Sequence, residues 1–270
     1  MLQSLISSGI IGLSLGTQYA LLSIGFTLIF GILGVVNFAH GGFYIIGGYL
    51  AYSLSHSLGM PYFAAIVVAA LATGALGYVI EVLVVDRHVA DHLTTMLITL
   101  GVYQMMTTGV TIVYGAEPMD FPFPVTGSLH GKGFYLPYST LVVLGVCTVA
   151  ISTVYLLIFK TRYGIALRAM ADDRPVARAL GIPPARMFPM AFAIATALSG
   201  LTGALVTPIL SLEPHSGEAV LGKAFIVGLI EAYTSVFLGG SQGALALFIV
   251  VVVLLLVRPN GLLGTVARKA

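Results

Sequence analysis

The stretch YFAAIVVAALATGALGYVIEVLVV, residues 62–85, decides the fold class of this chain. Its only charged residue is Glu81, and its other side chains are apolar, small or weakly polar. A helix rises about 1.5 Å per residue, so about 20 such residues are enough to cross the hydrocarbon core of a bilayer. The stretch therefore predicts a transmembrane helix.

The composition extends this conclusion to the rest of the sequence. Of the 270 residues, 58% are hydrophobic and 8% are charged, whereas soluble domains carry about 25% charged residues. This excludes a soluble enzyme, a disordered chain and a peripheral membrane protein. The net charge of +2 gives no sign of a nucleic-acid partner. The single Cys147 excludes an internal disulfide and a cysteine-based zinc site, and we expect neither a metal nor a cofactor.

Further apolar stretches repeat the pattern along the chain. They lack the polar–apolar alternation of barrel strands, so each is predicted to be an α-helix. The 32 glycines favour close helix packing in lipid. We expect an all-α, polytopic transmembrane helix bundle with about 7–8 membrane segments, in one transmembrane domain over residues 1–270. The expected segments are residues 5–36, 43–58, 62–85, 93–114, 136–159 and 188–210, with an interrupted apolar region over 217–257.

Lysine and arginine residues predict the orientation, because they gather in cytoplasmic loops. Half of the 12 basic residues lie in the loop 160–187, which is therefore expected in the cytoplasm. The proline-rich loop 115–135 contains a single basic residue, Lys132, and is therefore expected on the outer side of the membrane. Three more basic residues follow the last apolar region, so the C-terminus is also predicted to be cytoplasmic. The six basic residues of the loop 160–187 are Lys160, Arg162, Arg168, Arg174, Arg178 and Arg186.

Within that loop, residues 172–183 predict a short helix with its own caps. Asp172 or Asp173 can accept hydrogen bonds from the first free N–H groups, and Gly181 suits the left-handed position after the helix. Arg174 and Arg178 are four residues apart and share a face. The apolar residues Val176, Ala179 and Leu180 form a small face of their own. Such a helix either docks into a groove of a soluble partner or lies at the lipid headgroups, and the spacing leaves both open.

A second polar segment, Asn-Phe-Ala-His-Gly-Gly over residues 37–42, interrupts the apolar sequence. One interpretation makes Asn37 a helix cap and lets His40 donate to a nearby carbonyl. The other makes the segment a polar bend beside a transport pathway, since irregular backbone at membrane depth is tolerated only within protein or beside water.

Acidic residues inside the apolar stretches are also candidates, because such acids are costly in lipid. Glu81 and Glu231 are the two, and Gln104 is a weaker polar candidate. The sequence contains no catalytic motif, so we expect a chain that is not an enzyme.

At these segments the chain resembles the membrane-spanning permease subunits of bacterial ABC importers for branched-chain amino acids, of the LivH type. Urea and amide permeases belong to the same wider family. The resemblance covers nearly the whole chain in order, and the loop after residue 160 is its most specific part. The stretches that carry it are GILGVVNFAHGGFYIIGG (31–48), DHLTTMLITLG (91–101), TRYGIALRAMADDRPVARALGI (161–182), ALSGLTGALVTP (197–208) and RPNGLLG (258–264).

The resemblance implies a multi-pass subunit of the bacterial inner membrane that hydrolyses no ATP itself. Its partners would be two ATP-binding subunits, a second permease that is identical or paralogous, and an extracytoplasmic substrate-binding protein. The loop 160–187 would couple the permease to the ATPases, through Arg168, Asp172, Asp173, Arg174, Arg178 and Gly181. The translocation pathway would be lined by candidates Asn37, His40, Tyr44, Gln104 and Glu231.

The C-terminal region departs from the family pattern. A glycine-rich turn usually follows a stretch like residues 223–227, but here Val227 runs directly into the next apolar residues. Two apolar stretches after Leu210 would also leave the C-terminus outside, against its basic charge. The span count therefore leaves two alternatives: the stretch with Glu218, Lys223 and Glu231 does not span fully, or a span's worth of sequence is absent. The family pattern predicts that about one helical hairpin is missing.

Two questions remain open at this stage. The substrate is by default an apolar amino acid, while urea, short amides and aromatic acids are alternatives. A stand-alone secondary transporter or channel that uses Glu81, Glu231 or His40 is the alternative function.

Overall fold

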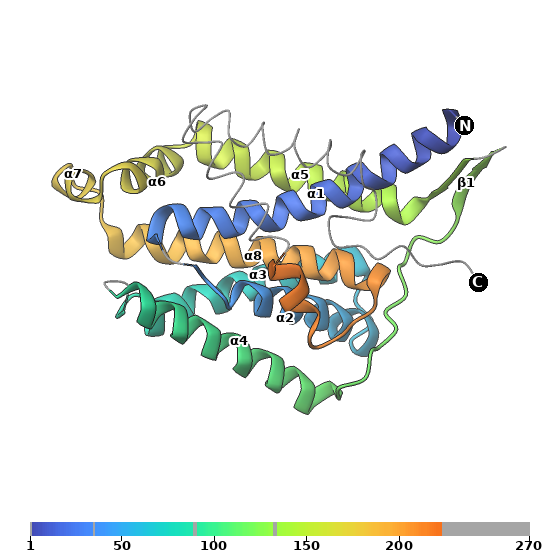
Figure 1. The fold of residues 1–270 in the computed structure, drawn as a ribbon, viewed down its shortest axis with the longest axis horizontal. Coiled ribbons are helices and arrows are strands. Elements are labelled where there is room, and N and C mark those ends of the chain that lie inside the picture. Colours follow the sequence, from blue (N-terminus) through green and yellow to red (C-terminus); the bar gives the residue numbers. More distant parts are fainter. Residues whose placement is uncertain (1, 35, 89–90, 132–133, 223–270) are drawn as a thin grey trace.

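The chain folds into a bundle of long helices in a computed structural model (Figure 1), which describes residues 2–34, 36–88, 91–131 and 134–222. Five of these helices are long and apolar enough to cross a membrane, at the positions that the apolar stretches predict. They are α1 (Leu2–Leu33), α3 (Tyr62–Ile80), α4 (His92–Tyr114), α5 (Tyr138–Lys160) and α8 (Pro184–Leu210).

The second predicted segment, residues 43–58, is shorter and lies inside the bundle. Helix α2 (His40–Tyr52) continues into one π-helical turn, η1 (Ser53–Ser57), and almost all of its residues are buried. Helix α3 ends in a similar π-helical turn, η2 (Glu81–Val85). The sequence pattern did not reveal either π turn.

Helix α8 lies at the centre of the bundle and packs against α1, α2 and α3 (Figure 1). Glycine makes these approaches possible. A Cβ atom on Gly203 would overlap the carbonyl of Tyr44 in α2, and one on Gly47 would overlap the backbone of Gly200. Small residues allow helix backbones to meet in lipid, where packing and not water exclusion drives association.

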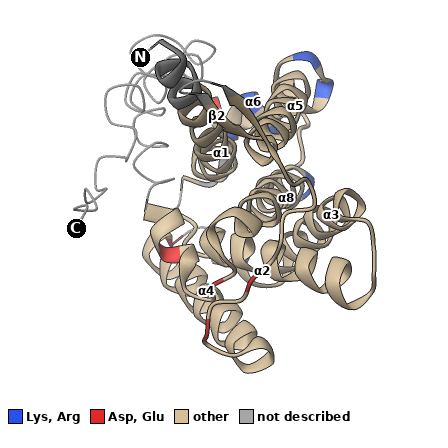
Figure 2. Cartoon of the chain, turned by 90° about the vertical axis from the view of Figure 1, so that its right-hand side faces the viewer, with Lys and Arg blue, Asp and Glu red and all other residues tan. Residues whose placement is uncertain are grey.

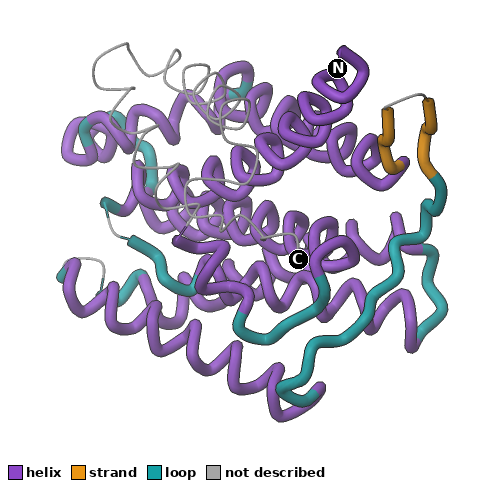
Figure 3. Tube along the Cα trace, turned by 45° about the vertical axis from the view of Figure 1, so that its right-hand side comes forward, coloured by secondary structure: helices purple, strands orange, loops and turns teal. Residues whose placement is uncertain are grey.

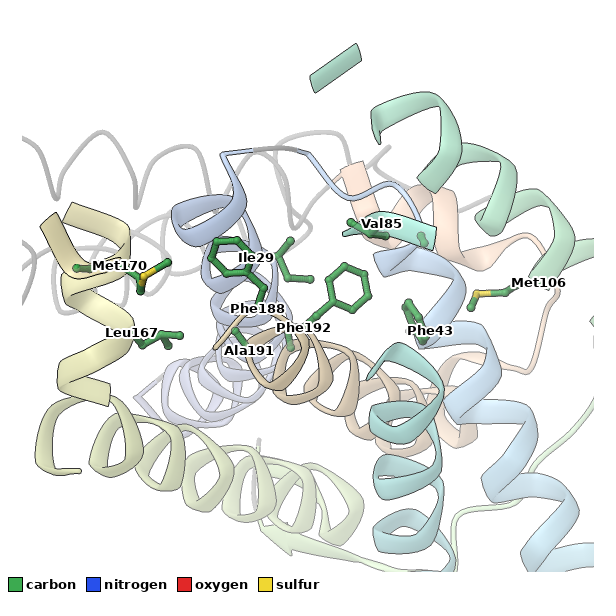
Figure 4. Close-up of a cluster of buried hydrophobic side chains, with 12 residues drawn as sticks. Ile29, Phe43, Val85, Met106, Leu167, Met170, Phe188, Ala191 and Phe192 are labelled. Carbon is green, nitrogen blue, oxygen red and sulfur yellow. The ribbon is translucent and has the colours of Figure 1, made fainter. Parts of the chain in front are cut away.

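One apolar cluster joins the loop after α5 to this centre (Figure 4). Leu167 and Met170 of α6 (Arg162–Asp172) are buried in the same cluster as Phe188 and Phe192 of α8. The ring of Phe192 meets that of Phe43 edge to face, with 6.2 Å between centroids. The loop 160–187, which the sequence predicts to be cytoplasmic, is therefore packed against the rest of the fold.

The two ends of the bundle carry different structures. Helices α6 and α7 (Arg174–Ala179) project at one end, and the strands β1 (Ser128–Gly131) and β2 (Phe134–Pro137) form a hairpin at the other (Figure 1). The sequence predicted only an irregular loop over the hairpin residues. After α4 the chain runs along the outside of the bundle to reach this hairpin (Figure 3).

Charged residues are sparse on the described ribbon. Figure 2 looks along the bundle from the hairpin end and shows mostly uncharged ribbon, with lysines and arginines near α5 and α6. This agrees with a chain whose long helices lie in lipid.

Candidate functional site

Helix α2 begins deep inside the bundle. The carbonyl of Leu22, near the middle of α1, accepts a hydrogen bond of 3.0 Å from His40 Nε2. The hydroxyl of Ser199, near the middle of α8, donates to the carbonyl of His40 at 2.7 Å. The first residue of α2 therefore lies at the mid-depth of both neighbouring helices, and residues 36–39 lead the chain back into the bundle.

The polar segment 37–42 combines features of both interpretations. His40 donates to a carbonyl, as the local interpretation predicts. That interpretation is wrong for Asn37, because the cap residue of α2 is Ala39 and the Asn37 Oδ1 atom accepts from the Ala39 N–H at 3.0 Å, before the helix begins. However, Asn37 Nδ2 and His40 Nδ1 are buried without a hydrogen-bond partner in the part of the chain that the structure describes. Because a carbonyl can only accept, Nε2 carries the proton of a neutral His40, and Nδ1 is an acceptor.

The predicted pathway residues do not all lie together. Tyr44 is one turn beyond His40 on α2 and is equally buried. Gln104 is exposed on α4, on the face opposite to its buried neighbours Tyr103 and Met106. Glu231 lies outside the described residues. The structure thus groups Asn37, His40 and Tyr44 and places Gln104 elsewhere.

The inward face of α4 carries a polar stripe that the sequence analysis missed. Thr95, Thr99, Tyr103 and Thr107 follow one another at intervals of four and are all buried. The hydroxyl of Thr99 accepts a hydrogen bond of 3.2 Å from the N–H of Phe38, which joins the stripe to the segment before α2. The four-residue spacing is visible in the sequence and was the available signal.

The loop between α5 and α8 has the caps predicted for residues 172–183, and a further cap at Thr161 that was not predicted. The Thr161 hydroxyl accepts from the Gly164 N–H at 3.1 Å and begins α6. The Asp173 carboxylate accepts from the Val176 N–H at 3.0 Å and begins α7. Gly181 has a φ of 86° after α7 ends. Asp172 is the last residue of α6, so Asp173 is the one of the two acids that caps α7.

The three arginines of this loop that are candidates for coupling have different surroundings. The guanidinium of Arg174 lies 5.3 Å from the ring centre of Phe188 in α8, which ties α7 to the bundle. Arg168 lies 5.0 Å from the ring centre of Phe159 in α5. Arg178 is exposed. Arg174 and Arg178, expected on one face, are therefore divided between an internal contact and the surface.

Helix α7 presents apolar side chains to the outside. It buries Ala177 against the bundle, while Val176 is 53% and Leu180 is 76% exposed. We refer to Val176, Arg178 and Leu180 as the α7 surface. An amphipathic helix with its apolar side uncovered is a feature of partner-binding helices.

Three further ionisable groups lie outside the candidate sites described above: Asp91, Tyr163 and Glu81. Hydrogen bonds from the hydroxyl and N–H of Thr94 hold the pKa of Asp91 below its usual range, and this carboxylate caps α4. Burial raises the pKa of the Tyr163 phenol in α6 to about 12. Glu81 is fully buried, and neither carboxylate oxygen has a hydrogen-bond partner among the described residues.

Comparison with protein families shows to which family the chain belongs. Residues 9–265 match the model of the branched-chain amino acid transport system permease component. The chain belongs to this family.

Individual relatives support the assignment over most of the permease. LivH, a high-affinity branched-chain amino acid transport system permease protein of Escherichia coli, is 28% identical over 94% of this chain and 93% of its own length. BraD of Pseudomonas aeruginosa is 27% identical over 94% of both chains. LivM of Escherichia coli is 22% identical, over 94% of this chain and 64% of LivM. No solved structure matches the permease.

The family confirms several expectations. The chain is a multi-pass membrane permease component of an ABC transport system for branched-chain amino acids, and it is not an enzyme. The helical bundle agrees with the fold class predicted from the sequence.

The alignment with LivH bears on the hairpin expected to be missing. It spans 288 positions, whereas 94% of 270 residues is about 254, so about 34 aligned positions have no counterpart in this permease. The predicted place of that gap, after Val227, lies outside the described residues and stays a prediction.

Proposed function

We propose that this permease forms a translocation pathway for branched-chain and other apolar amino acids together with a second permease, and that α7 transmits ATP-driven movement from a cytoplasmic ATPase. The α7 surface is the observation that carries the coupling part of the proposal. Val176 and Leu180 are exposed on a separately capped helix, at the end of the bundle that holds most of the described basic residues.

The construction of the loop suits a mechanical connection. Met170 of α6 and Ala177 of α7 are buried in the same cluster as Phe188 of α8. The Arg174 guanidinium adds a second contact with the Phe188 ring. A force on the α7 surface would therefore reach α8, which packs against α1, α2 and α3 at the centre of the bundle. Packed helices move as bodies, so displacement of α8 would shift the helices around α2.

The partners follow from the relatives. LivH and LivM are two distinct permease proteins of branched-chain amino acid transport in Escherichia coli, and this chain is similar to both. We propose a core of two permeases, identical or paralogous, with two ATP-binding subunits in the cytoplasm and an extracytoplasmic substrate-binding protein. The loop 160–187 and the C-terminus would lie on the cytoplasmic side of the plasma membrane.

The pathway is proposed to pass the start of α2. Asn37 and His40 have buried, unpartnered polar atoms there in the described structure, and Tyr44 lies one turn beyond. The exposed Gln104 and the undescribed Glu231 remain candidates on the sequence alone. Membership of an ABC permease family favours this function over a stand-alone secondary transporter.

Charge reversal on α7 tests the coupling. In a complex co-expressed with its ATPases and binding protein, Arg178→Glu with Leu180→Asp should abolish most ATP-dependent uptake of L-leucine and lower the amount of co-purified ATPase. Arg174 is kept, because its contact with Phe188 supports the loop itself. Arg186→Glu, at an exposed position in the first turn of α8, is the matched control and should leave uptake intact.

Two results would contradict the proposal. One is unchanged ATPase recovery and uptake in the Arg178→Glu, Leu180→Asp variant. The other is leucine uptake by this chain alone in liposomes, driven by a proton gradient without any ATPase.

A further inference from the structure

The start of α2 has the properties of an anion-binding helix terminus. Its cap residue, Ala39, provides no side-chain acceptor. The first N–H groups of a helix have no partner within the helix, and of these the His40 N–H donates to the carbonyl of Asn37 at 3.3 Å. The Asn37 carboxamide is bonded through Oδ1 to the Ala39 N–H, so its NH₂ group also lies at this terminus. That NH₂ group is buried, with Asn37 only 3% exposed, and has no acceptor among the described residues.

The field at this terminus favours negative charge. Helix N-termini carry a partial positive charge, and they bind carboxylates and phosphates through their N–H groups. The hydrogen bonds to Leu22 and Ser199 place this terminus at mid-depth in the bundle, where His40 is fully buried. Interrupted helices whose N-terminal ends meet an anionic substrate group at such a depth are a recurring feature of transporters.

A second group of polar atoms lies next to this terminus. The hydroxyls of Tyr103 and Thr107 on α4 are buried without a hydrogen-bond partner in the described residues, and these residues are 3% and 1% exposed. Glu218 is an exposed residue of the helical stretch 216–222, and its carboxylate is close enough to act on the Tyr103 phenol. Carboxylate and hydroxyl oxygens are acceptors suited to an ammonium group.

The two groups are neighbours because glycines bring their backbones together. A Cβ atom on Gly41 would lie 2.6 Å from the carbonyl of Gly217, the residue before Glu218. A Cβ atom on Gly42 would lie 3.4 Å from the ring of Tyr103. The first turn of α2 thus contacts both α4 and the segment that carries Glu218. Apolar side chains of Ile45, Met106 and Leu221 surround the same contacts.

We propose that these two groups form a binding site for a zwitterionic amino acid. The α2 terminus and the Asn37 NH₂ group hold the α-carboxylate, while Glu218, Tyr103 and Thr107 hold the α-ammonium. The apolar surroundings take the side chain. The proposal rests on the proposed function and narrows its substrate class, because urea and simple amides carry neither charge and would leave both groups of the site unpaired.

The test uses the full complex with its ATPases and binding protein in proteoliposomes, and L-leucine as the probe. The binding protein is the same in every variant, so changes in uptake at saturating leucine report on the membrane step. Glu218→Gln and Asn37→Asp should each lower the maximal uptake about tenfold or more, the effect of losing a hydrogen bond to a charged group. Glu218→Asp keeps the charge and should retain most of the uptake.

Glu213→Gln is the matched control, because Glu213 is an exposed acid five residues earlier in the same segment. It should change uptake less than about twofold. Assembly is measured in parallel as the amount of co-purified ATPase. If a charge variant does not assemble, it is replaced by Tyr103→Phe and Thr107→Val. Each of these removes one hydroxyl and should lower uptake by about fivefold.

The outcomes separate this site from the proposed function. No ATP-dependent leucine uptake by the unmodified complex would overturn the proposed function. A second result would overturn the binding site and leave the proposed function intact. In that result the unmodified complex takes up leucine normally, and the assembled Glu218 and Asn37 variants, or both hydroxyl variants, lose less than about twofold.

Discussion

A single carboxylate separates α7 from α6. Asp173 accepts a hydrogen bond from the Val176 N–H and satisfies one of the free donors at the start of α7. Its neighbour Asp172 belongs to the end of α6 and has no such role. The two acids have the same charge and similar exposure, so they form a natural pair for measuring what the cap contributes.

Asp173→Ala is expected to lower the local stability of α7 by about 1 kcal/mol, since the Val176 N–H loses its acceptor. Hydrogen exchange of the α7 backbone amides in the assembled complex measures this as faster exchange. Asp173→Asn should restore protection, because an amide oxygen also caps. Equal effects of Asp172→Ala and Asp173→Ala would contradict the assignment of the cap.

Asp91 gives a pH-dependent prediction at the start of α4. Hydrogen bonds from Thr94 lower the pKa of Asp91 in the folded chain. A depressed folded pKa means that the cap stabilises α4 above the unfolded pKa and that this contribution is lost as the pH falls through the folded pKa. Protection of the first α4 amides, corrected for intrinsic exchange, should therefore fall between about pH 5 and pH 3.

The variant Asp91→Asn provides the control for this pH dependence. Its side chain can still accept a hydrogen bond but does not titrate, so protection of the same amides should be nearly constant over that range. A parallel fall in both proteins would show that another group is responsible.

Among the elements, those whose structure depends on local sequence were predictable. The apolar stretches gave the bounds of α3, α4 and α8 to within a few residues, because lipid requires an unbroken helix. The caps of α7 could also be predicted from the local sequence. The depth at which α2 begins depends on contacts of His40 with Leu22 and Ser199, which are distant in sequence. No local pattern encodes that depth.

The candidate site shows the same division. Asn37 and His40 stood out because polar residues interrupted an apolar stretch. Tyr103 and Thr107 lie within a helix that also has exposed polar residues. Their stripe can be recognised as buried only once α2 is known to pack against it. Gln104 was selected on polarity alone, although its exposed position separates it from the stripe.

Close packing of α2 on α8 yields a prediction at this scale. Gly203→Ala would drive a Cβ atom into the Tyr44 carbonyl, and relief requires the two helices to separate. We expect a loss of about 1–3 kcal/mol, the usual cost of overpacking. Gly145→Ala in α5, where a Cβ would meet no atom of the described structure within 4 Å, is the matched control.

The thermal midpoint of the purified complex in detergent measures both variants. Gly203→Ala should lower it clearly, while Gly145→Ala should leave it unchanged or raise it slightly, since alanine favours the helix more than glycine does. A similar midpoint for the two variants would mean that α2 and α8 do not meet as closely as Gly203 indicates.

At the scale of the whole molecule, the bundle has two chemically distinct ends. The hairpin β1–β2 follows the proline-rich connection, and the opposite end carries α6, α7 and most of the described basic residues (Figures 1 and 2). The proposed zwitterion site lies between them, at the depth where α2 begins. An ATPase on one end and a binding protein on the other would each act on this site through helices that span the full bundle, of which α8 contacts the most neighbours.

Cysteine labelling tests this orientation directly. Cys147 is the chain's one cysteine and is buried, so Cys147→Ala provides a background for Ser128→Cys at the hairpin and Leu180→Cys on the α7 surface. In intact cells a membrane-impermeant maleimide should label Ser128→Cys and not Leu180→Cys, because loops rich in lysine and arginine are usually retained in the cytoplasm. After permeabilisation Leu180→Cys should react, and co-expressed ATPase should reduce that reaction because it covers the α7 surface. Labelling of Leu180→Cys in intact cells would reverse the orientation, and labelling that is insensitive to the ATPase would remove α7 from the interface.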